Sequence, residues 1–276
     1  MVVQLHNRVA VVTGASHGLG LQVAIRLARH GAKVALVARS GKPMEEFAAK
    51  IHDDGGTALA IAADVSDPQA VDELKSKVER QLGPPNILVN AAGVFGPIQW
   101  IKNSPQDRWI ETILINTVGP YLTSRAFLSG MLASGWGRIV NFSSAAAFHH
   151  PGPLNSAYAT SKVALNQFTR HLAAEIAGTG VTANMIHPGD VKTEMWAAIR
   201  DEVNRQGPDA EAFGQWVEWV DRTGGDDPDR AVDLVLKLMS DEAASINGQF
   251  LWIEGGLQAP IPSWTEAANT QPWKSS

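Results

Sequence analysis

The sequence contains no cysteine among its 276 residues. This absence excludes disulfide bonds and zinc sites built on thiolates. The eight histidines form no H-E-x-x-H or similar ligand pattern, so we expect no metal site. No apolar run approaches membrane-spanning length, and no basic, apolar and small-residue signal pattern precedes the first expected strand. We therefore expect a soluble, cytoplasmic protein with no membrane partner.

Charge and composition narrow the class further. The net charge of −5 at pH 7 provides no basic face for nucleic acid, so no nucleic-acid partner is expected. Hydrophobic residues make up 45% of the chain and charged residues 18%, which allows one large buried core. We expect one domain over residues 1–258.

Short β-type runs alternate with segments of helical periodicity along most of the chain, which predicts βαβ units and an α/β fold with a seven-stranded parallel sheet. Strands are expected near residues 9–13, 33–38, 57–62, 87–90, 137–142, 181–187 and 249–253. Helices are expected near residues 18–30, 44–53, 68–82, 105–133, 155–177 and 229–239. Residues 194–227 break the alternation, and the Pro-rich residues 259–276 predict an extended tail.

A glycine-rich run, Thr13-Gly-Ala-Ser-His-Gly-Leu-Gly20, follows the β-branched residues 9–12 and opens an amphipathic stretch. This is the strand, turn and helix context that a phosphate-binding loop needs. Glycines let the backbone approach a pyrophosphate, and the helix N-terminus supplies free N–H groups and a positive dipole end. The run therefore indicates a nucleotide cofactor.

Tyr158 and Lys162 are one helical turn apart in an Ala-rich helical segment. At this spacing both side chains project from one helix face, so an ammonium can lie near a phenol and favour its ionised form. Such a phenol can give up and take back a proton near neutral pH. Taken alone the pair is a weak signal, because any helix can hold a partly buried Tyr beside a solvated Lys by chance.

Further motifs follow in order: Asn90-Ala-Ala-Gly93, Asn116, Ser143-Ser144, Tyr158 with Lys162, and Pro188-Gly-Asp-Val-Lys-Thr193. With the glycine run they make the chain resemble the short-chain dehydrogenase/reductase family, in its subtype of about 250 residues, over nearly the whole length. The resemblance implies a Rossmann-type, doubly wound sheet with helices on both faces. It also implies a nicotinamide-dependent oxidoreductase that interconverts a ketone and a secondary alcohol.

The resemblance implies four catalytic residues, Asn116, Ser144, Tyr158 and Lys162. Tyr158 would exchange a proton with the substrate oxygen as general acid or base, and Ser144 would hydrogen-bond the carbonyl. Lys162 would lower the pKa of the phenol and bind the nicotinamide ribose, while Asn116 would fix a water that links Lys162 to solvent. Ser143 is the alternative serine, since the loop from Ser144 to Tyr158 is one residue longer than the usual family spacing. For Asn116, a helix-interior side chain bonded to its own backbone is the alternative.

Charge after the second expected strand favours NADP(H) over NAD(H). Ala38 stands where NAD-preferring dehydrogenases normally carry an acid that binds the ribose hydroxyls. Arg39 follows it and can pair with a 2′-phosphate, although an ordinary solvated arginine is the alternative. Asp64 with Val65 resembles the family's adenine-contacting pair, and a turn-capping Asp is nearly as good an interpretation.

By resemblance, the cofactor site combines the glycine turn with residues that follow later strands. The expected members are Gly14, Ser16, His17, Gly18, Leu19, Gly20, Arg39, Asp64, Val65, Asn90, Ala91, Gly93, Tyr158, Lys162, Pro188, Gly189, Val191 and Thr193.

The substrate is a small ketone or alcohol whose identity the sequence leaves open. In this family the segment after the Pro-Gly turn forms a substrate lid, assigned here to residues 194–227, and its aromatic residues suit an apolar or ring-containing substrate. The same aromatic residues could instead be helix core. Candidate substrate contacts are Phe95, His150 and Trp196.

The expected activity is 3-oxoacyl-reductase-like or that of another carbonyl reductase. Gly135 and Thr179 lie where carrier-protein-dependent relatives tend to be basic, so an acidic carrier has no obvious docking point. The alternatives are a catalytically silent NADP-binding sensor or structural subunit, and an epimerase or dehydratase on the same fold.

Assembly into a homotetramer is expected, with a homodimer as the alternative. The expected helices at 105–133 and 155–177 carry more apolar surface than one sheet face covers, and residues 250–253 are expected to form an apolar strand at a sheet edge. By resemblance, the two helices form a four-helix bundle with a neighbour and the last strand meets its equivalent across a second two-fold axis. The tail is expected to lie over a neighbouring subunit, anchored by Trp264.

Overall fold

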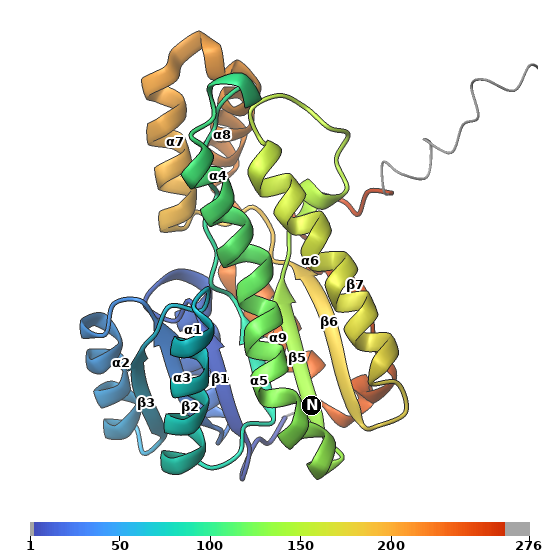
Figure 1. Ribbon diagram of the computed structural model, residues 1–276. Helices are drawn as coiled ribbons and strands as arrows, with labels where there is room; N and C mark the ends of the chain where they lie inside the picture. Colours follow the sequence, from blue (N-terminus) through green and yellow to red (C-terminus); the bar gives the residue numbers. More distant parts are fainter. Residues whose placement is uncertain (1–2, 263–276) are drawn as a thin grey trace, which may run out of the picture.

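A computed structural model describes residues 3–262 of the chain. Its centre is a seven-stranded, fully parallel sheet in the order β3-β2-β1-β4-β5-β6-β7 (Figure 1). The strands are β1 (Val9–Thr13), β2 (Lys33–Ala38), β3 (Thr57–Ala62), β4 (Ile87–Asn90), β5 (Gly137–Phe142), β6 (Val181–His187) and β7 (Phe250–Trp252). The order confirms the predicted seven-stranded, doubly wound Rossmann-type sheet.

The chain winds outward from β1 in two directions. It first runs through β2 to β3 and then returns to place β4 on the other side of β1. In an open parallel sheet this reversal leaves a crevice at the carboxyl ends of the two central strands, and ligands bind there. The glycine-rich turn follows β1 and the Asn90–Gly93 segment follows β4, so both border this crevice.

Helices cover both faces of the sheet. One face packs against α1 (Gly18–Arg29), α2 (Lys42–Asp53) and α9 (Pro228–Leu238), which contribute Leu27, Met44 and Val235 to a buried apolar cluster. The other face packs against α3 (Pro68–Gln81), α5 (Gly119–Ser134) and α6 (Ser156–Glu175). Strand residues fully buried on both sides explain why the strands read as continuous apolar runs in the sequence.

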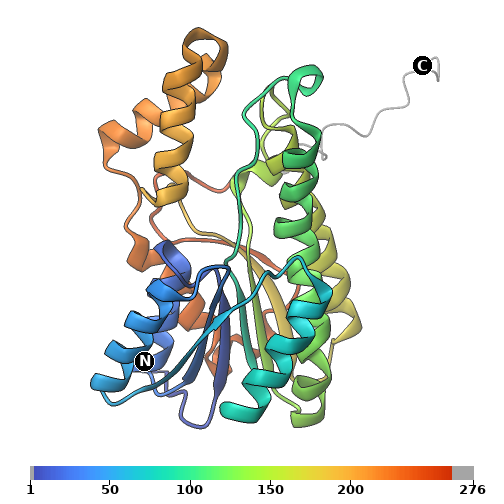
Figure 2. The same ribbon diagram turned by 60° about the vertical axis from the view of Figure 1, so that its left-hand side comes forward.

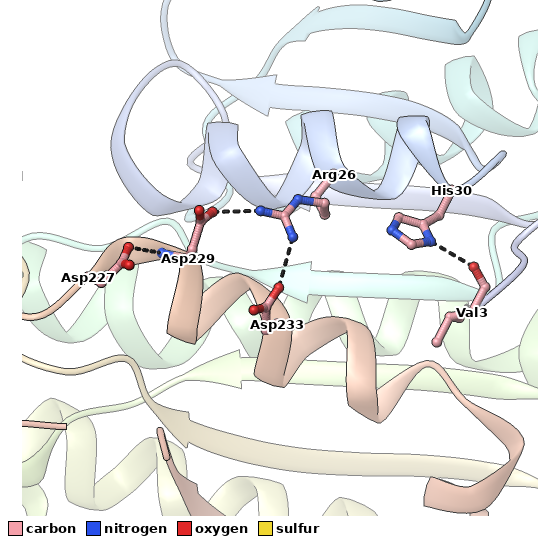
Figure 3. Close-up of polar contacts among 6 residues, drawn as sticks. All are labelled: Val3, Arg26, His30, Asp227, Asp229 and Asp233. Atoms are coloured by element: carbon pink, nitrogen blue, oxygen red, sulfur yellow. Dashed lines mark hydrogen bonds and ion pairs between the residues drawn. The ribbon is translucent and has the colours of Figure 1, made fainter. Parts of the chain in front are cut away.

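Ion pairs join α1 and α9, two helices that are far apart in the sequence. Arg26 of α1 donates to Asp229 and Asp233 of α9 at 2.8 Å or less, as Figure 3 shows. Asp227 accepts from the backbone N–H of Asp229 and so caps α9. His30, just after α1, contacts the carbonyl oxygen of Val3 at 2.7 Å. These contacts hold α1 in place against α9 and the N-terminal segment, and the first turn of α1 borders the crevice.

The long helix expected at residues 105–133 is interrupted. It consists of α4 (Gln106–Ile113), a π-helical segment (Leu114–Val118) and α5, which continue one another. The π segment carries Asn116, and π-helical turns are frequent at functional sites. Other element ends differ from the expected ones by one or two residues, and β7 is shorter than predicted. Single 3₁₀ turns occupy Ile101–Asn103, Ala145–Ala147, Gly207–Ala210 and Asp241–Ser245.

The segment after β6 projects beyond the sheet. It consists of α7 (Glu194–Gln206) and α8 (Glu211–Thr223), which extend past the strand ends (Figure 1) and stand apart from α4 when the molecule is turned (Figure 2). Ile199, Val203 and Val220 form a small apolar core of their own in this segment. Trp196, Ile199 and Trp216 of this segment lie at the crevice, and the segment is called the lid for this position.

Within residues 3–262, no helix combines the length and apolar character needed to cross a bilayer. The same part of the chain holds no cluster of three metal-ligating side chains. Residues 263–276, including Trp264, lie outside the described residues.

Candidate active site

A cavity of about 680 Å³ opens at the carboxyl ends of the strands, below the lid. Its volume falls in the range of small-molecule and cofactor sites. The glycine turn lies at one part of its wall, the residues after β2 and β3 at another, and Ser144, Tyr158 and Lys162 at a third. All predicted cofactor-binding residues except Asn90 line this cavity.

The glycine turn is shaped for close approach. Gly14 and Gly18 have φ angles of 68° and 57°, which side chains rarely adopt. A Cβ on Gly14 would come within 2.7 Å of the Ala92 backbone nitrogen, and one on Gly20 would collide with the carbonyl oxygen of Gly14. The N-terminus of α1 begins here with no side-chain cap, so its first-turn N–H groups are available to an anion. The turn therefore fits a pyrophosphate.

The lid touches the glycine turn where Glu194 approaches His17. The Nδ1 of His17 lies 3.4 Å from a carboxylate oxygen of Glu194, the first residue of α7. Thr193 caps α7, since its hydroxyl accepts from the backbone N–H of Trp196 at 3.4 Å. The start of α7 therefore lies against the glycine turn.

Arg39 lies at the cavity rim, where a 2′-phosphate would be recognised. Its guanidinium is 3.6 Å from Glu111 of α4, and that carboxylate is also held by Arg108 at 2.8 Å. Arg39 is well exposed, so its ion pair is weak and screened by solvent. A phosphate could compete for the guanidinium at little cost.

Asp64 caps a turn and lines the cavity as well. One of its carboxylate oxygens accepts from the backbone and the hydroxyl of Ser66 at 2.9 and 2.6 Å. The hydrogen bond from the Ser66 hydroxyl holds the pKa of Asp64 below its usual range. The turn-capping interpretation is therefore correct, and it leaves the second carboxylate oxygen for a ligand.

Tyr158 and Lys162 occupy one wall of the cavity, as their spacing on α6 requires. The Lys162 ammonium donates to the carbonyl oxygen of Phe142 at 2.7 Å and lies 5.4 Å from the centre of the Tyr158 ring. Phe95 stacks on the same ring at 4.5 Å, with an interplanar angle of 29°. The phenol is therefore held between an aromatic wall and a buried cation.

Burial controls the acidity of this pair. It raises the pKa of Tyr158 to about 12, with a hydrogen bond from Ser144 acting in the opposite direction and the Asp190 charge raising it further. Burial also lowers the pKa of Lys162 to about 8. The removal of the phenol from water therefore dominates the pKa of Tyr158, and the lowering expected from Lys162 is not among its causes in this arrangement.

The two serines have different partners. Ser143 is buried, and its hydroxyl donates to the amide oxygen of Asn166 at 2.6 Å. Ser144 begins the 3₁₀ turn Ala145–Ala147, accepts from the backbone N–H of Ala146 at 3.2 Å and interacts with Tyr158. The geometry therefore favours Ser144 as the serine that can meet a substrate at the phenol.

Asn116 lies behind the cavity wall rather than in it. Its amide donates to the carbonyl of Val94 at 2.8 Å and to the Ser161 hydroxyl at 3.0 Å, and its oxygen accepts from the N–H of Val94 at 2.9 Å. These partners lie outside its own helix, so the interpretation of an Asn bonded to its own backbone is wrong. The amide ties the loop after β4 to α6, beside Gly93 and Lys162.

Two predicted site residues lie elsewhere. Asn90 is buried beneath the cavity, where it donates to Asn141 at 2.8 Å and accepts from Thr123 at 2.8 Å. Its amide is used to join β4, β5 and α5, which excludes it from the cofactor surface. His150 is exposed and is not part of the cavity wall, because the loop after β5 carries it outward.

The other two candidate substrate contacts do line the cavity. Phe95 follows β4 and Trp196 belongs to α7, where the indole is buried against the small core of the lid. Trp216 of α8 also reaches the cavity. The lid aromatics thus serve both as lid core and as cavity wall.

Two cavity residues were not singled out from the sequence. His187 ends β6, is buried, and accepts from the N–H of Ala145 at 3.2 Å; burial lowers its pKa to about 4. Asp190 follows the Pro188-Gly189 turn, and its carboxylate accepts from the indole N–H of Trp216 at 3.1 Å. The only signal in the sequence was their position directly before and after the Pro-Gly pair.

Comparison with known proteins identifies the class. Residues 8–204 match the short chain dehydrogenase family. The chain belongs to this family of oxidoreductases, whose members bind a nicotinamide cofactor.

Relatives share much of this sequence. A short chain dehydrogenase of Pseudocercospora fijiensis (strain CIRAD86) is 38% identical over 198 residues, covering 70% of this chain and 63% of the relative. The chain thus spans less than two thirds of the length of that relative. A short-chain type dehydrogenase/reductase of Picea abies is 35% identical over 260 residues, covering 91% of this chain and 93% of the relative.

Solved structures of similar fold include two reductases. A variant of actinorhodin polyketide ketoreductase with NADPH superposes with a TM-score of 0.80 and 30% identity, covering 89% of this chain and 95% of the other. L-Sorbose reductase from Gluconobacter frateurii, complexed with NADPH and L-sorbose, has a TM-score of 0.81 and 28% identity, covering 95% of this chain and 100% of the other.

Proposed function

We propose that this protein is an NADP(H)-dependent carbonyl reductase that interconverts a ketone and a secondary alcohol, with Tyr158 as the general acid and base. One observation carries the proposal: the Tyr158 phenol, the Lys162 ammonium and the Ser144 hydroxyl meet on the wall of the cavity that also contains the glycine turn. A proton donor, a fixed cation and a carbonyl-orienting hydroxyl are the groups that ketone reduction requires.

The nicotinamide supplies the hydride when it is bound. Ser144 donates a hydrogen bond to the substrate carbonyl and holds it against the phenol. Tyr158 then gives its proton to the carbonyl oxygen, and in the reverse direction its phenolate takes the proton of the alcohol. Lys162, anchored on the Phe142 carbonyl, stabilises the phenolate while it carries charge.

Asn116 acts on this centre through two neighbours. Its amide bonds the backbone of Val94, in the loop after β4, and the hydroxyl of Ser161, the residue before Lys162. A Cβ on Gly93 would come within 3.3 Å of the Asn116 oxygen, so the loop is closely packed against it. We assign Asn116 to the placement of Lys162 and to the proton path that leads from it.

The preference for NADP(H) rests on charge at the rim. Arg39 is free to leave its exposed pair with Glu111, and Ala38 places no carboxylate where a 2′-phosphate would lie. The two similar reductases named above were both solved with NADPH. Leu19, Val65 and Val191 complete the apolar wall of the cofactor part of the cavity.

Assembly and location are part of the proposal. Tyr121 of α5 and Val163 of α6 are exposed apolar residues, as are Ile110 and Leu114 beside them on α4 and the π segment. Exposed apolar groups on these helices support a homotetramer built on helix pairing. We propose a cytoplasmic location, where a reductase has access to NADPH; cell fractionation tests it.

The test is consumption of NADPH with a panel of ketones that includes 3-oxoacyl thioesters, sugars and simple ketones. We expect turnover with NADPH and at least about tenfold lower kcat/KM with NADH, because the 2′-phosphate adds a charge-assisted hydrogen bond. Tight NADPH binding without turnover of any ketone would contradict the proposal and favour a sensor. Product formation without net change of the cofactor would instead indicate an epimerase or dehydratase.

A further inference from the structure

Asp190 is the acidic residue that shares the reaction end of the cavity with Tyr158. It follows the Pro188-Gly189 turn, lines the same cavity as Tyr158 and Ser144, and is close enough to Tyr158 for its charge to raise the pKa of the phenol. The reaction assigned to Tyr158 does not use this carboxylate. A negative charge beside a group that must become phenolate opposes catalysis, so another role is needed to account for it.

The carboxylate is held firmly in place. Trp216 of the lid donates its indole N–H to one carboxylate oxygen at 3.1 Å. The backbone N–H of Asp190 donates to Asp226 at 2.8 Å, and the N–H of Asp226 donates to the Asp190 carbonyl at 3.0 Å. Asp226 therefore holds the backbone at Asp190, and the side chain cannot turn out to solvent without losing its bond with Trp216.

The second carboxylate oxygen is buried and has no hydrogen-bond partner among the described residues. Burial, and after it the nearby charge of Asp226, raise the pKa of Asp190, while the Trp216 hydrogen bond lowers it. A buried carboxylate oxygen without a donor costs free energy unless a ligand supplies the donor. Phe95, Met195 and Ile199, which line the same cavity, are apolar and offer none.

We propose that Asp190 is a specificity-determining residue that accepts a hydrogen bond from a hydroxyl group of the substrate, which makes the substrates neutral hydroxyketones and the corresponding diols. The inference rests on the proposed carbonyl reductase activity and names the class of its substrate. A site with a fixed acceptor rejects analogues that lack the matching donor more strongly than an apolar pocket rejects a missing methylene.

Charge disfavours keto acids and amino ketones as substrates. A keto acid would bring a carboxylate against Asp190, and the repulsion would lower its affinity. An amino ketone would bring an ammonium to a centre that already holds the Lys162 ammonium. A neutral hydroxyl satisfies the orphan oxygen without either conflict.

The test compares two ketones of the same shape, hydroxyacetone and butanone, which have the same number of non-hydrogen atoms. The main variant is Asp190→Asn, because its amide oxygen can still accept from Trp216 while an NH₂ group replaces the orphan oxygen. The measured quantity is the ratio of kcat/KM for hydroxyacetone to that for butanone, in which any general loss of activity cancels. The matched control is Asp221→Asn, which removes an exposed lid carboxylate that pairs with Lys192.

We expect the wild-type ratio to favour hydroxyacetone and to fall about tenfold in Asp190→Asn, since a hydrogen bond to a charged group is replaced by a neutral one. Pyruvate measured against butanone should gain in the same variant, because the repelling charge is gone. Asp221→Asn should leave both ratios as in the wild type. Equal loss for both ketones in Asp190→Asn, or the same shift in the control, would overturn the inference while leaving the proposed reductase intact.

Binding decides the inference if no ketone is reduced, an outcome that would refute the proposed activity itself. Calorimetry with the NADPH-loaded protein then compares hydroxyacetone with butanone directly. Tighter binding of hydroxyacetone that Asp190→Asn abolishes supports the assignment. Equal binding of the two ketones to the wild type contradicts it.

Discussion

The paired serines offer a sharp test of the active-site geometry, because their hydroxyls have different partners. Ser144→Ala removes the hydroxyl that interacts with Tyr158 and is assigned to the substrate carbonyl. A hydrogen bond to a carbonyl that develops negative charge is worth about 1.5–3 kcal/mol, so kcat/KM should fall roughly 10- to 150-fold. Ser144→Thr keeps a hydroxyl and should recover part of that loss.

Ser143→Ala should behave differently. The Ser143 hydroxyl donates to Asn166 at 2.6 Å in a partly buried site, so its removal leaves a partly buried amide oxygen without this donor. Such a loss costs about 0.5–1.5 kcal/mol of unfolding free energy. We expect kcat/KM to stay within about threefold of the wild type, because no interaction made in the transition state is lost.

The assay is ketone reduction under kcat/KM conditions together with urea unfolding of each variant. The reasoning is refuted if Ser143→Ala abolishes turnover at unchanged stability while Ser144→Ala remains active. That pattern would move the catalytic role to Ser143 and show that the one-residue-longer loop before Tyr158 shifts the usual assignment.

Three further predictions concern the cofactor and pH. Arg39→Ala should weaken NADPH binding by about tenfold or more and leave NADH almost unchanged, since only NADPH carries the 2′-phosphate; equal effects in fluorescence titrations would remove Arg39 from the site. Gly20→Ala should abolish binding of both cofactors or prevent folding, because its Cβ would collide with Gly14, and a stable variant with normal NADPH affinity would contradict the close approach. Because burial raises the pKa of Tyr158 to about 12, the phenol is protonated throughout the neutral range. Ketone reduction should therefore change little between about pH 6 and 7, below the pKa of about 8 at which Lys162 loses its charge, and alcohol oxidation, which needs the phenolate, should rise with pH over the same range. Initial rates measured in both directions across this pH range check the prediction. An oxidation rate that falls as pH rises would oppose the role of Tyr158 as general acid and base.

The sequence predicted the sheet well because its strands are short, buried and β-branched. Strand residues that are buried on both faces give short, continuous apolar runs such as 9–12, whose β-branched residues favour a strand. The helices between them carry clear apolar stripes. The last strand was predicted too long. Its residues are only partly buried at the sheet edge, so pattern alone could not set where its pairing stops.

Motifs located the centre of the site but not all of its wall. The spacing on α6 is local, and so Tyr158 and Lys162 were placed correctly relative to each other. Asn90 was assigned to the cleft by motif, yet its amide joins strands beneath it, because side-chain direction at a strand end depends on tertiary partners. The pairing of Asp190 with Trp216 joins a turn to a lid helix, and no sequence period reports such a contact.

The π-helical segment illustrates the same limit. A continuous helix was predicted across residues 105–133, and apolar periodicity does continue through it. The extra residue per turn at Leu114–Val118 coincides with the position of Asn116, whose partners are Val94 and Ser161. These partners come from other elements, so only the packed structure shows why the helix departs from α-helical geometry here.

The most direct test of the account is Tyr158→Phe, which keeps the ring and removes only the proton donor. The ring would still stack on Phe95, and the glycine turn and Arg39 are untouched, so NADPH affinity should stay within about threefold of the wild type. Ketone reduction should lose more than about 99% of kcat, a loss of roughly 3 kcal/mol or more of transition-state stabilisation. Retention of more than about one per cent of kcat at normal NADPH affinity would contradict the central claim that Tyr158 is the general acid and base.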